Sequence, residues 1–436
     1  MRSVLLQERF LDDYRGIVTE ETVTALREAA APLEGRRVLH INSTSYGGGV
    51  AEILSSMVPL MRDLGMDAHW KVIEGDEEFF RITKTIHNGL QGGQVTLSEK
   101  MQNHYLEVNR RNAEDLEDGW DFVIVHDPQP AALLIHREVK LGKREGKWIW
   151  RCHIDMSTPY PDCLAFLSKF IPSYDSSIFS LEGYIPPGIG LRRPVVIHPS
   201  IDPLTGKNRP MSPQEVELIA RRYGVDPSKP TVCAVARFDP WKDPLGIIDL
   251  YKFIKGQRPG PSNRLPRLLR LYKAVKGEVR DFQLLLVASM AHDDPEGWEY
   301  YERALRRAGE DPDIFFLTNL RGVGGEEVNA FQRCSDVAVM RSIREGFGLT
   351  VSEALWKRVP VVGSRVGGIP LQVLDGETGF LTEDAQTAAE RIVRLIKDEG
   401  LRRRLGEAGR AHVRRRFLIT RHLRDYVDLM AGLSQK

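Results

Sequence analysis

The sequence predicts an α/β protein built from two doubly wound domains, each with a parallel sheet that is covered by helices. Three observations support this fold class. The 436 residues are enough for two or three domains. Short apolar runs alternate with helical stretches along both halves of the chain. These runs are apolar nearly throughout, as expected for strands that helices bury on both faces.

The composition excludes several classes of protein. Hydrophobic residues make up 42% of the chain and charged residues 28%, so it is neither disordered nor collagen-like. The 61 basic and 60 acidic residues leave a net charge of +1, less than a dedicated nucleic-acid binder usually carries. No apolar run approaches 18 residues, no secretory signal is recognisable, and the four cysteines form no CxxC pair. We therefore expect a cytoplasmic protein with reduced thiols and no membrane or nucleic-acid partner.

Ten strands are expected, five in each half of the chain. In order, they cover residues 37–42, 121–127, 148–154, 176–180, 194–198, 231–238, 283–289, 314–318, 336–340 and 360–363. Apolar residues at helical spacing predict a helix over 50–64 after the first strand, and Gly65 suits its C-cap. A similar helix is expected over 349–358.

A linker is expected between the two halves. Residues 199–213 are rich in Pro, Ser, Gly and Asn and poor in apolar side chains. This places one domain at 1–200 and a second after it. Ligands of doubly wound sheets bind at the carboxyl ends of the strands, so two such domains facing each other across a cleft would bind a ligand there.

Three segments have the composition of an anion or sugar site. Gly47–Gly49 form a turn before the 50–64 helix, which favours an anion, although a purely structural turn is an equal alternative. Arg237 and Lys242 follow the strand at 231–238 and suit a diphosphate, unless they only cap a helix. The loop and helix start at 344–353 carries Glu345 and Glu353, which could bind sugar hydroxyls or act only as a surface charge and a helix-dipole partner.

The spacing of these residues resembles a known family. Glu345 and Glu353 stand in an E-x7-E pattern, and R-x4-K at 237–242 and the glycine turn precede it. The combination resembles family 4 of the retaining, nucleotide-sugar-dependent glycosyltransferases. Finer strings at 40–52, 126–130, 151–155, 290–298 and 343–349 resemble the trehalose glycosyltransferring synthases within that family.

The resemblance implies the GT-B fold, with two Rossmann-like domains. Residues 1–200 would form the acceptor-side domain, 201–416 would bind the nucleotide sugar, and a final helix within 417–436 would pack back on the first domain. The resemblance also implies a role for each site residue. The catalytic set would be His153, Arg237, Lys242 and Glu345. The donor would contact Gly48, Gly49, Phe347, Gly348, Leu349 and Glu353, with Glu353 on the ribose. The acceptor would contact Asp127, Gln129, Asp155, His292 and Asp293.

The expected reaction is transfer of glucose from a nucleoside diphosphate glucose, with UDP, ADP or a similar nucleotide, to free glucose. The product would be α,α-trehalose, with retention at the donor carbon and no covalent nucleophile. Loops 127–130 and 155–158 offer carboxylates, an amide and hydroxyls, which suit a neutral acceptor. Arg151, the one nearby cation, is expected to turn to the side opposite His153.

Other interpretations stay open. They are a trehalose phosphorylase or another family 4 glycosyltransferase, a non-catalytic sugar-nucleotide sensor, and, more distantly, an NAD(P)-binding oxidoreductase. The last is disfavoured because Glu52 occupies the third glycine position of GxGxxG. We expect no tightly bound cofactor or protein-ligated metal, with Mg²⁺ at most stimulating the reaction, and a homodimer. The basic segment 255–273 is expected to be a surface insertion or a contact with an anionic partner.

Overall fold

The computed structural model describes residues 1–257, 279–290 and 295–435. The chain forms two compact units. Unit 1 comprises Met1–Ser200 together with Ile419–Lys436, and unit 2 comprises Ile201–Leu418. Each unit has its own sheet and its own hydrophobic core, so the predicted class of two α/β domains is confirmed.

Unit 1 contains a seven-stranded sheet in the order β1-β3-β2-β4-β5-β6-β7. All neighbours are parallel except β1, which runs antiparallel to β3. The strands are β1 (Arg2–Ser3), β2 (Arg37–Asn42), β3 (Asp67–Val72), β4 (Phe122–His126), β5 (Lys147–Arg151), β6 (Ser176–Phe179) and β7 (Pro194–Val196). The sequence predicted five of these strands. It did not predict β1, which has only two residues, or β3, in which polar residues alternate with apolar ones.

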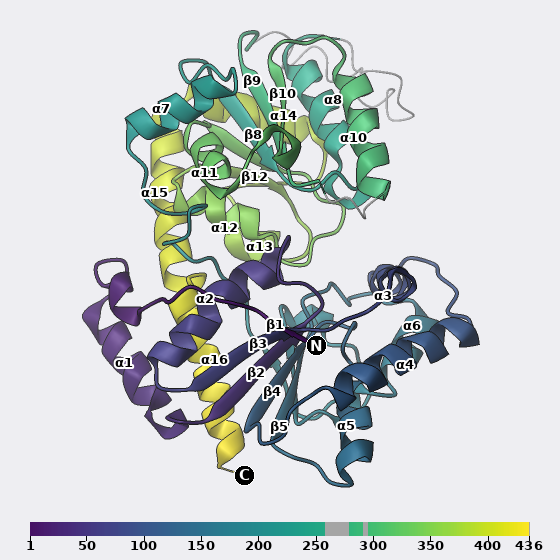
Figure 1. Cartoon of the computed structure of the whole chain (residues 1–436). Coiled ribbons are helices and arrows are strands. Elements are labelled where there is room, and N and C mark those ends of the chain that lie inside the picture. Colours follow the sequence, from purple (N-terminus) through teal and green to yellow (C-terminus); the bar gives the residue numbers. More distant parts are fainter. Residues whose placement is uncertain (258–278, 291–294, 436) are drawn as a thin grey trace. The chain divides into compact units, whose positions relative to one another are not determined.

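Helices cover both faces of this sheet (Figure 1). On one face α16 packs against α1 and α2, and on the other α4 packs against α3 and α5. The helices are α1 (Glu20–Ala30), α2 (Gly49–Asp63), α3 (Glu77–Leu90), α4 (Glu99–Glu114), α5 (Leu133–Leu141), α6 (Pro161–Leu167) and α16 (Ile419–Ser434). The last segment of the chain thus lies in unit 1, although it follows unit 2 in sequence.

Unit 2 contains a six-stranded, wholly parallel sheet in the order β10-β9-β8-β11-β12-β13. The strands are β8 (Thr231–Val235), β9 (Gln283–Ala288), β10 (Ile314–Thr318), β11 (Val337–Met340), β12 (Val361–Ser364) and β13 (Gly379–Thr382). The four-residue β13 was not expected from the sequence. The strand order reverses between β8 and β11, and ligands of such sheets bind beside the carboxyl ends at this reversal.

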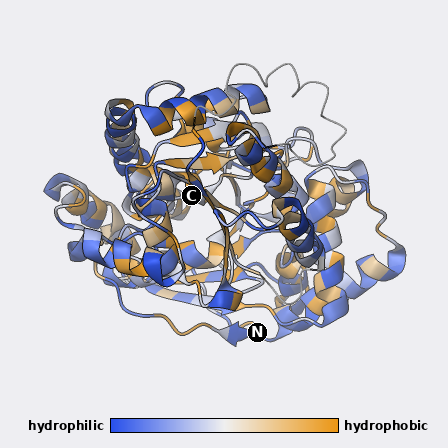
Figure 2. Ribbon diagram, turned by 90° about the horizontal axis from the view of Figure 1, so that it is seen from above, coloured by the Kyte–Doolittle hydropathy of each residue, from blue (hydrophilic) through white to orange (hydrophobic). Residues whose placement is uncertain are grey.

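The helices of unit 2 also form two layers. α7 packs on α11, whereas α8 packs on α10 and α14, and α15 packs on α12. They are α7 (Pro213–Arg222), α8 (Pro244–Ile254), α10 (Pro295–Ala308), α11 (Gly325–Arg333), α12 (Leu349–Trp356), α13 (Ile369–Gln372), α14 (Ala385–Lys397) and α15 (Glu399–Arg416). Figure 2 shows hydrophobic and hydrophilic residues interspersed along the helices of the chain, as in amphipathic helices with one buried side.

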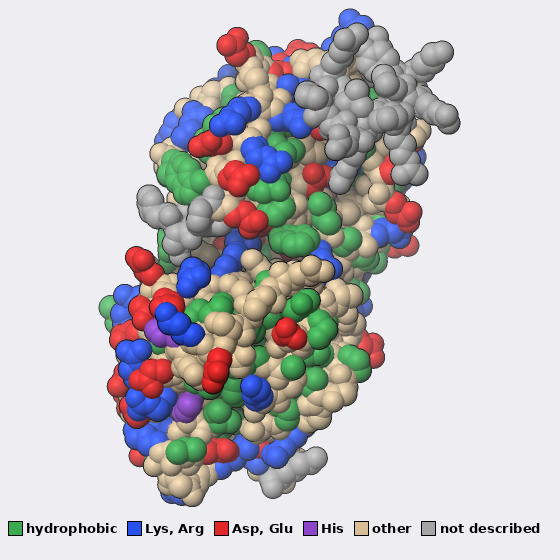
Figure 3. Space-filling model, turned by 90° about the vertical axis from the view of Figure 1, so that its right-hand side faces the viewer, with side chains coloured by type: hydrophobic (Ala, Val, Ile, Leu, Met, Phe, Trp, Pro, Cys, Tyr) green, Lys and Arg blue, Asp and Glu red, His purple; other side chains and the backbone are tan. Residues whose placement is uncertain are grey.

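The described surface mixes charges of both signs. Figure 3 shows Lys and Arg side chains interspersed with Asp and Glu on the face that it displays. Within the described residues, no helix is both long and apolar enough to cross a membrane. The predicted basic segment at 255–273 lies outside the described residues from position 258 onward.

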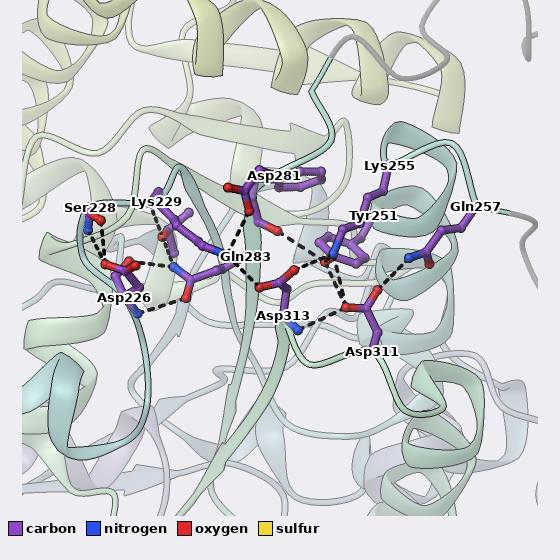
Figure 4. Close-up of polar contacts among 12 residues, drawn as sticks. Asp226, Ser228, Lys229, Tyr251, Lys255, Gln257, Asp281, Gln283, Asp311 and Asp313 are labelled. Carbon is purple, nitrogen blue, oxygen red and sulfur yellow. Dashed lines mark hydrogen bonds and ion pairs between the residues drawn. The ribbon is translucent and has the colours of Figure 1, made fainter.

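A network of ion pairs lies at the amino-terminal ends of the strands of the unit 2 sheet (Figure 4). The Lys255 ammonium contacts Asp311 at 3.2 Å and Asp313 at 2.7 Å, and Lys229 contacts Asp313 at 3.3 Å. Asp313 directly precedes β10 and Lys229 lies two residues before β8. This network therefore fastens α8 and the strand starts together, at the edge opposite to the one where a ligand is expected.

Candidate functional site

Two loops at the carboxyl-terminal edge of the unit 2 sheet carry most of the predicted donor residues. Residues 236–243 follow β8 and residues 341–348 follow β11, and these strands are neighbours in the sheet. The main-chain N–H of Ile343 donates to the carbonyl of Trp241 at 2.7 Å. This bond holds the two loops side by side, so the R-x4-K and E-x7-E segments belong to one site.

Lys242 and Glu345 form an ion pair within this site. Lys242 Nζ lies 2.6 Å from Glu345 Oε2, and the Ser342 hydroxyl donates to the same oxygen at 3.0 Å. Glu345 is only 7% exposed. The Asp239 carboxylate accepts from the main-chain N–H groups of Trp241 and Lys242, which fixes the short turn that directs Lys242. A buried carboxylate with one strong ionic partner keeps acceptor capacity for hydroxyl groups.

Arg237 differs from Lys242 in its surroundings. Its side chain is 56% exposed, and Arg237 Nη2 lies 3.3 Å from Asp239 Oδ2. The alternative that Arg237 caps a helix has no support in these contacts. An exposed guanidinium five residues before Lys242 is a second cation that can bind an anionic ligand without first breaking a buried contact.

The start of α12 is built around Gly348. This residue is the helix N-cap and has φ +83°, a conformation that favours glycine. A Cβ at this position would lie 3.2 Å from Glu345 Cγ. The preceding carbonyl of Phe347 accepts a hydrogen bond from Gln372 Nε2 in α13, and Gln372 is itself held by the Ser352 hydroxyl at 2.6 Å. These contacts fix the loop that carries Phe347, Gly348 and Leu349.

Glu353 is buried one turn into α12. It is 1% exposed, and Glu353 Oε1 pairs with Lys207 Nζ at 3.0 Å. Its other oxygen, Oε2, is buried without a hydrogen-bond partner among the described residues. Lys357 lies nearby and donates to Asn208 at 2.9 Å; burial lowers the pKa of Lys357 to about 7. Glu345 is buried as well, so the alternative that it is only a surface charge does not fit. The unmet buried acceptor of Glu353 fits a hydroxyl donor.

In unit 1, His153 follows β5 at the carboxyl-terminal edge of the sheet. His153 is partly exposed, and His153 Nε2 lies 3.0 Å from Nδ1 of His126. The main-chain N–H of His153 donates to Asp127 Oδ1 at 2.8 Å. Burial holds the pKa of His153 well below its usual range, and the positive charge of Arg151 lowers it further. His153 is therefore a neutral imidazole at physiological pH.

The predicted acceptor residues of unit 1 lie on the same loops. Asp127 has φ +65°, and burial raises the pKa of its carboxyl to about 6. Gln129 Oε1 is buried without a hydrogen-bond partner among the described residues. Asp155 is 6% exposed and accepts the main-chain N–H of Ser157 at 2.9 Å. All three side chains can form hydrogen bonds with a ligand. Asp127 and Asp155 also accept main-chain N–H groups and so stabilise the loop that follows β5.

The expectation that Arg151 turns away from His153 is wrong. Arg151 pairs with His126 in the sheet register, and the His126 ring stacks on the His153 ring with centroids 5.3 Å apart, so Arg151 and His153 lie on the same face. The Arg151 side chain is 0% exposed and donates to the Ser180 hydroxyl at 3.4 Å. Its guanidinium is therefore enclosed in the protein interior, which is the reason that it presents no charge at the surface.

The glycine turn of unit 1 is open. Gly47 has φ +74°, Gly48 is the N-cap of α2 and Gly49 is the first residue of that helix. A Cβ at Gly47 or Gly48 would meet no atom within 4 Å. Close packing within the chain therefore does not explain these glycines, which leaves room for a ligand beside the helix start.

Two predicted acceptor residues lie outside the described part of the chain, and three residues that contact the site were not predicted from the sequence. His292 and Asp293 lie outside the described residues. Within the described part of the chain, no three His, Cys, Asp or Glu side chains are grouped as metal ligands. Lys207, Ser342 and Gln372 contact the predicted site residues but were not identified from the sequence. Lys207 lies in the linker and Gln372 is 19 residues beyond Glu353, so neither belongs to a local motif.

Comparisons with known proteins give a consistent result. Residues 40–186 match the family described as trehalose synthase, N-terminal domain, and residues 215–412 match glycosyl transferases group 1. The chain is similar to the trehalose synthase of Pyrococcus horikoshii, with 47% identity over 429 residues that cover 98% of this chain and 97% of that protein. It is less similar to the trehalose phosphorylase of Pleurotus pulmonarius, with 26% identity over 442 residues that cover 92% of this chain and 58% of that protein.

Solved structures resemble the chain in fold. The sucrose-phosphate synthase from Thermosynechococcus elongatus superposes with a TM-score of 0.67 and 15% sequence identity. The match covers 92% of this chain and 99% of that structure. At this identity the likeness concerns the arrangement of helices and strands, which here extends over both units.

Proposed function

The chain belongs to the trehalose synthase family of GT-B glycosyltransferases, and we propose that it transfers glucose from a nucleoside diphosphate glucose to free glucose, forming α,α-trehalose. The observation that carries this proposal is the joined pair of loops after β8 and β11. These loops carry the cations Arg237 and Lys242, and Lys242 pairs with the buried carboxylate of Glu345 in the loop that leads into α12.

The donor half of the proposal follows from the charges of these groups. Arg237 and Lys242 would neutralise the diphosphate, and the amides at Phe347–Leu349 would donate to its oxygens. Glu345 would accept from hydroxyls of the donor glucose. Glu353 Oε2, a buried acceptor without a partner among the described residues, would accept from the ribose. A site with separate provision for phosphate, glucose and ribose suits a nucleotide sugar.

The proposed chemistry breaks the bond between the anomeric carbon of glucose and the diphosphate oxygen. Negative charge develops on the leaving diphosphate, where fixed cations stabilise it. The anomeric hydroxyl of the acceptor glucose attacks from the side that the diphosphate leaves, which retains the α-configuration. Its proton passes to the leaving phosphate oxygen. The products are trehalose and a nucleoside diphosphate, so no group is lost or gained.

A neutral acceptor is supported by the residues of unit 1. Asp127, Gln129 and Asp155 offer carboxyl and amide groups, and the nearby Arg151 is fully buried. A phosphorylated acceptor would need exposed cations, because carboxylates repel phosphate. The predicted acceptor is therefore unphosphorylated glucose.

Trehalose phosphorylase is the second candidate. The similarity to the Pleurotus pulmonarius phosphorylase over 92% of this chain supports it. A phosphorylase would transfer glucose between α-glucose 1-phosphate and glucose without a nucleotide, so the buried carboxylate of Glu353 would have no ribose to bind. This difference, together with the higher identity to a trehalose synthase, favours the nucleotide-dependent reaction.

The test is a matrix of donors and acceptors, with products identified by NMR. UDP-glucose, ADP-glucose and α-glucose 1-phosphate are each offered with glucose and with glucose 6-phosphate. We expect α,α-trehalose from a nucleotide donor and glucose. Trehalose from α-glucose 1-phosphate alone would establish the phosphorylase, and preferred use of glucose 6-phosphate or any other linkage would contradict the proposal. Parallel assays with EDTA and with added Mg²⁺ test the expected stimulation without a tightly bound metal.

A further inference from the structure

Three histidines occupy neighbouring strands of the unit 1 sheet in a stepped arrangement. His40 lies in β2, His126 ends β4 and His153 follows β5. His40 pairs with Ile124 in the register, so His126 lies two residues further along the next strand. His126 pairs with Arg151, so His153 lies two residues further again. Because steps of two keep the same face, all three rings lie on one side of the sheet.

The rings form a continuous hydrogen-bonded chain. His40 Nδ1 lies 3.0 Å from His126 Nε2, and His126 Nδ1 lies 3.0 Å from His153 Nε2. At the inner end, His40 Nε2 lies 3.4 Å from the sulfur of Met61 in α2. His40 is 0% exposed and His126 is 2% exposed, so water does not compete for these bonds.

Each ring is neutral at physiological pH. Burial lowers the pKa of His40 to about 3, and burial holds the pKa of His126 and of His153 well below the usual range. The positive charge of Arg151 contributes in the same direction at His126 and His153. A neutral imidazole carries one N–H donor and one bare nitrogen acceptor, so every ring in the chain must donate at one end and accept at the other.

The Met61 sulfur determines which ring nitrogen donates in each hydrogen bond between the histidines. A thioether accepts hydrogen bonds weakly and donates none. If His40 Nε2 were the bare nitrogen, it would be a buried acceptor facing a group that cannot donate, which costs free energy. The proton of His40 therefore sits on Nε2, and His40 Nδ1 accepts. It follows that His126 donates from Nε2, and that His153 donates from Nε2 to His126 Nδ1.

We propose that Met61, His40 and His126 act as positioning residues that fix His153 in the Nε2–H tautomer, so that His153 Nδ1 is a hydrogen-bond acceptor for a hydroxyl of the bound sugar. Among the described residues no partner contacts His153 Nδ1, and Asp127 holds the adjoining main-chain N–H at 2.8 Å. The sugar part of this inference rests on the proposed function. The tautomer part rests on the geometry alone.

The first experiment measures the tautomers directly. Long-range ¹H–¹⁵N correlation spectra of the ¹⁵N-histidine-labelled full chain distinguish protonated from bare ring nitrogens, and single His→Gln variants assign the signals. We expect the Nε2–H form at His40, His126 and His153. An Nδ1–H form at His153 would overturn the proposal.

Two methionine variants test the direction. Met61→Leu removes the sulfur that His40 contacts, whereas Met57→Leu changes a methionine of the same helix that is 1% exposed and forms no hydrogen bond with a histidine among the described residues. We expect Met61→Leu to give a mixture of tautomers at His153 and Met57→Leu to leave the spectrum unchanged. An unchanged His153 signal in Met61→Leu would overturn the role of Met61.

Two variants of His126 test the effect on turnover. His126→Asn keeps an amide oxygen near the Nδ1 position, which can accept from His153, whereas His126→Gln moves the amide toward the Nε2 position. We expect His126→Asn to retain kcat/KM within about threefold and His126→Gln to lose about tenfold or more, a loss of the size that follows removal of the residue that orients a metal-binding histidine. Equal losses in both would indicate only a structural role.

The two proposals fail in different ways. If the donor and acceptor matrix gives no trehalose but His153 still shows the Nε2–H tautomer that responds to Met61→Leu, the proposed function fails and the histidine chain stands. If trehalose forms but His153 shows the Nδ1–H tautomer, the histidine chain fails and the proposed function stands.

Discussion

Lys242 Nζ lies 2.6 Å from Glu345 Oε2, so the cation proposed for the diphosphate and the carboxylate proposed for the donor glucose neutralise each other before a substrate binds. The pair is largely shielded from water, with side-chain exposures of 17% and 9%. Removing one partner of such a pair leaves the other charge poorly compensated, whereas removing both does not. Stability and catalysis can therefore be separated by single and double variants.

The Lys242→Met variant is expected to lower turnover by about 10² to 10³, because one fixed cation no longer stabilises the leaving diphosphate. Its melting temperature should also fall, because the buried carboxylate of Glu345 loses the cation that lies 2.6 Å away. Steady-state kinetics and thermal unfolding measure the two effects.

The double variant Lys242→Met with Glu345→Gln is expected to regain most of the lost melting temperature but none of the turnover. Lys229→Ala, which breaks an ion pair at the opposite edge of the same sheet, is the control and should leave kcat near normal. Near-normal turnover in Lys242→Met would remove the diphosphate role.

The Arg237→Ala variant is expected to lower turnover by a similar factor of about 10² to 10³ without changing the melting temperature. Arg237 is 56% exposed, and exposed ion pairs contribute little to stability, about 0–1 kcal/mol. Kinetics with saturating donor and calorimetric titration with UDP or ADP would measure the loss. Unchanged nucleotide affinity together with unchanged turnover would contradict the assignment.

The sequence predicted the strands that build both sheets because most of them are continuous apolar runs. β3 escaped because Asp67, His69 and Lys71 interrupt its apolar residues, and β13 because four residues carry little pattern. The fold class therefore followed from periodicity, whereas strands with polar positions needed the three-dimensional structure.

The candidate donor residues could be proposed from the sequence because they stand at fixed spacings in two short segments. Their supporting contacts could not, because they join distant parts of the chain. Lys207 reaches Glu353 across 146 positions of sequence, and Gln372 reaches the carbonyl of Phe347 across 25. The hydrogen-bonded histidines were missed for the same reason. His40, His126 and His153 are far apart in the sequence, and only the register of the strands that carry or precede them brings them together.

The Gly348→Ala variant is expected to weaken donor binding. A side chain at φ +83° costs about 1–2 kcal/mol, and the new Cβ would also lie 3.2 Å from Glu345 Cγ, so the carboxylate would shift. Gly376→Ala is the matched control, since Gly376 has φ +78° but no atom within 4 Å of an added Cβ. Both variants should lose similar stability in thermal unfolding, but only Gly348→Ala should raise the KM for the donor. Equal KM values would contradict the proposed role of the α12 start.

Asp127 should make the stability of the protein depend on pH. Burial raises the pKa of its carboxyl from 3.8 to about 6 in the folded state. The folded protein therefore binds this proton more tightly than the unfolded chain. The resulting contribution to the free energy of unfolding is fully present below about pH 4 and is lost as the pH rises through about 6. At pH 7.5 the buried charge is expected to cost up to about 3 kcal/mol.

The Asp127→Asn variant removes this charge while keeping the oxygen that accepts the main-chain N–H of His153. Asn also tolerates the left-handed conformation at φ +65°, so no new backbone strain is introduced. We expect the variant and the wild-type chain to melt at similar temperatures near pH 4, and the variant to melt several degrees higher at pH 7.5. Melting curves followed by circular dichroism across this range measure the difference, and the acid end serves as the internal control. A constant difference in melting temperature at all pH values would show that Asp127 does not take up a proton in this range.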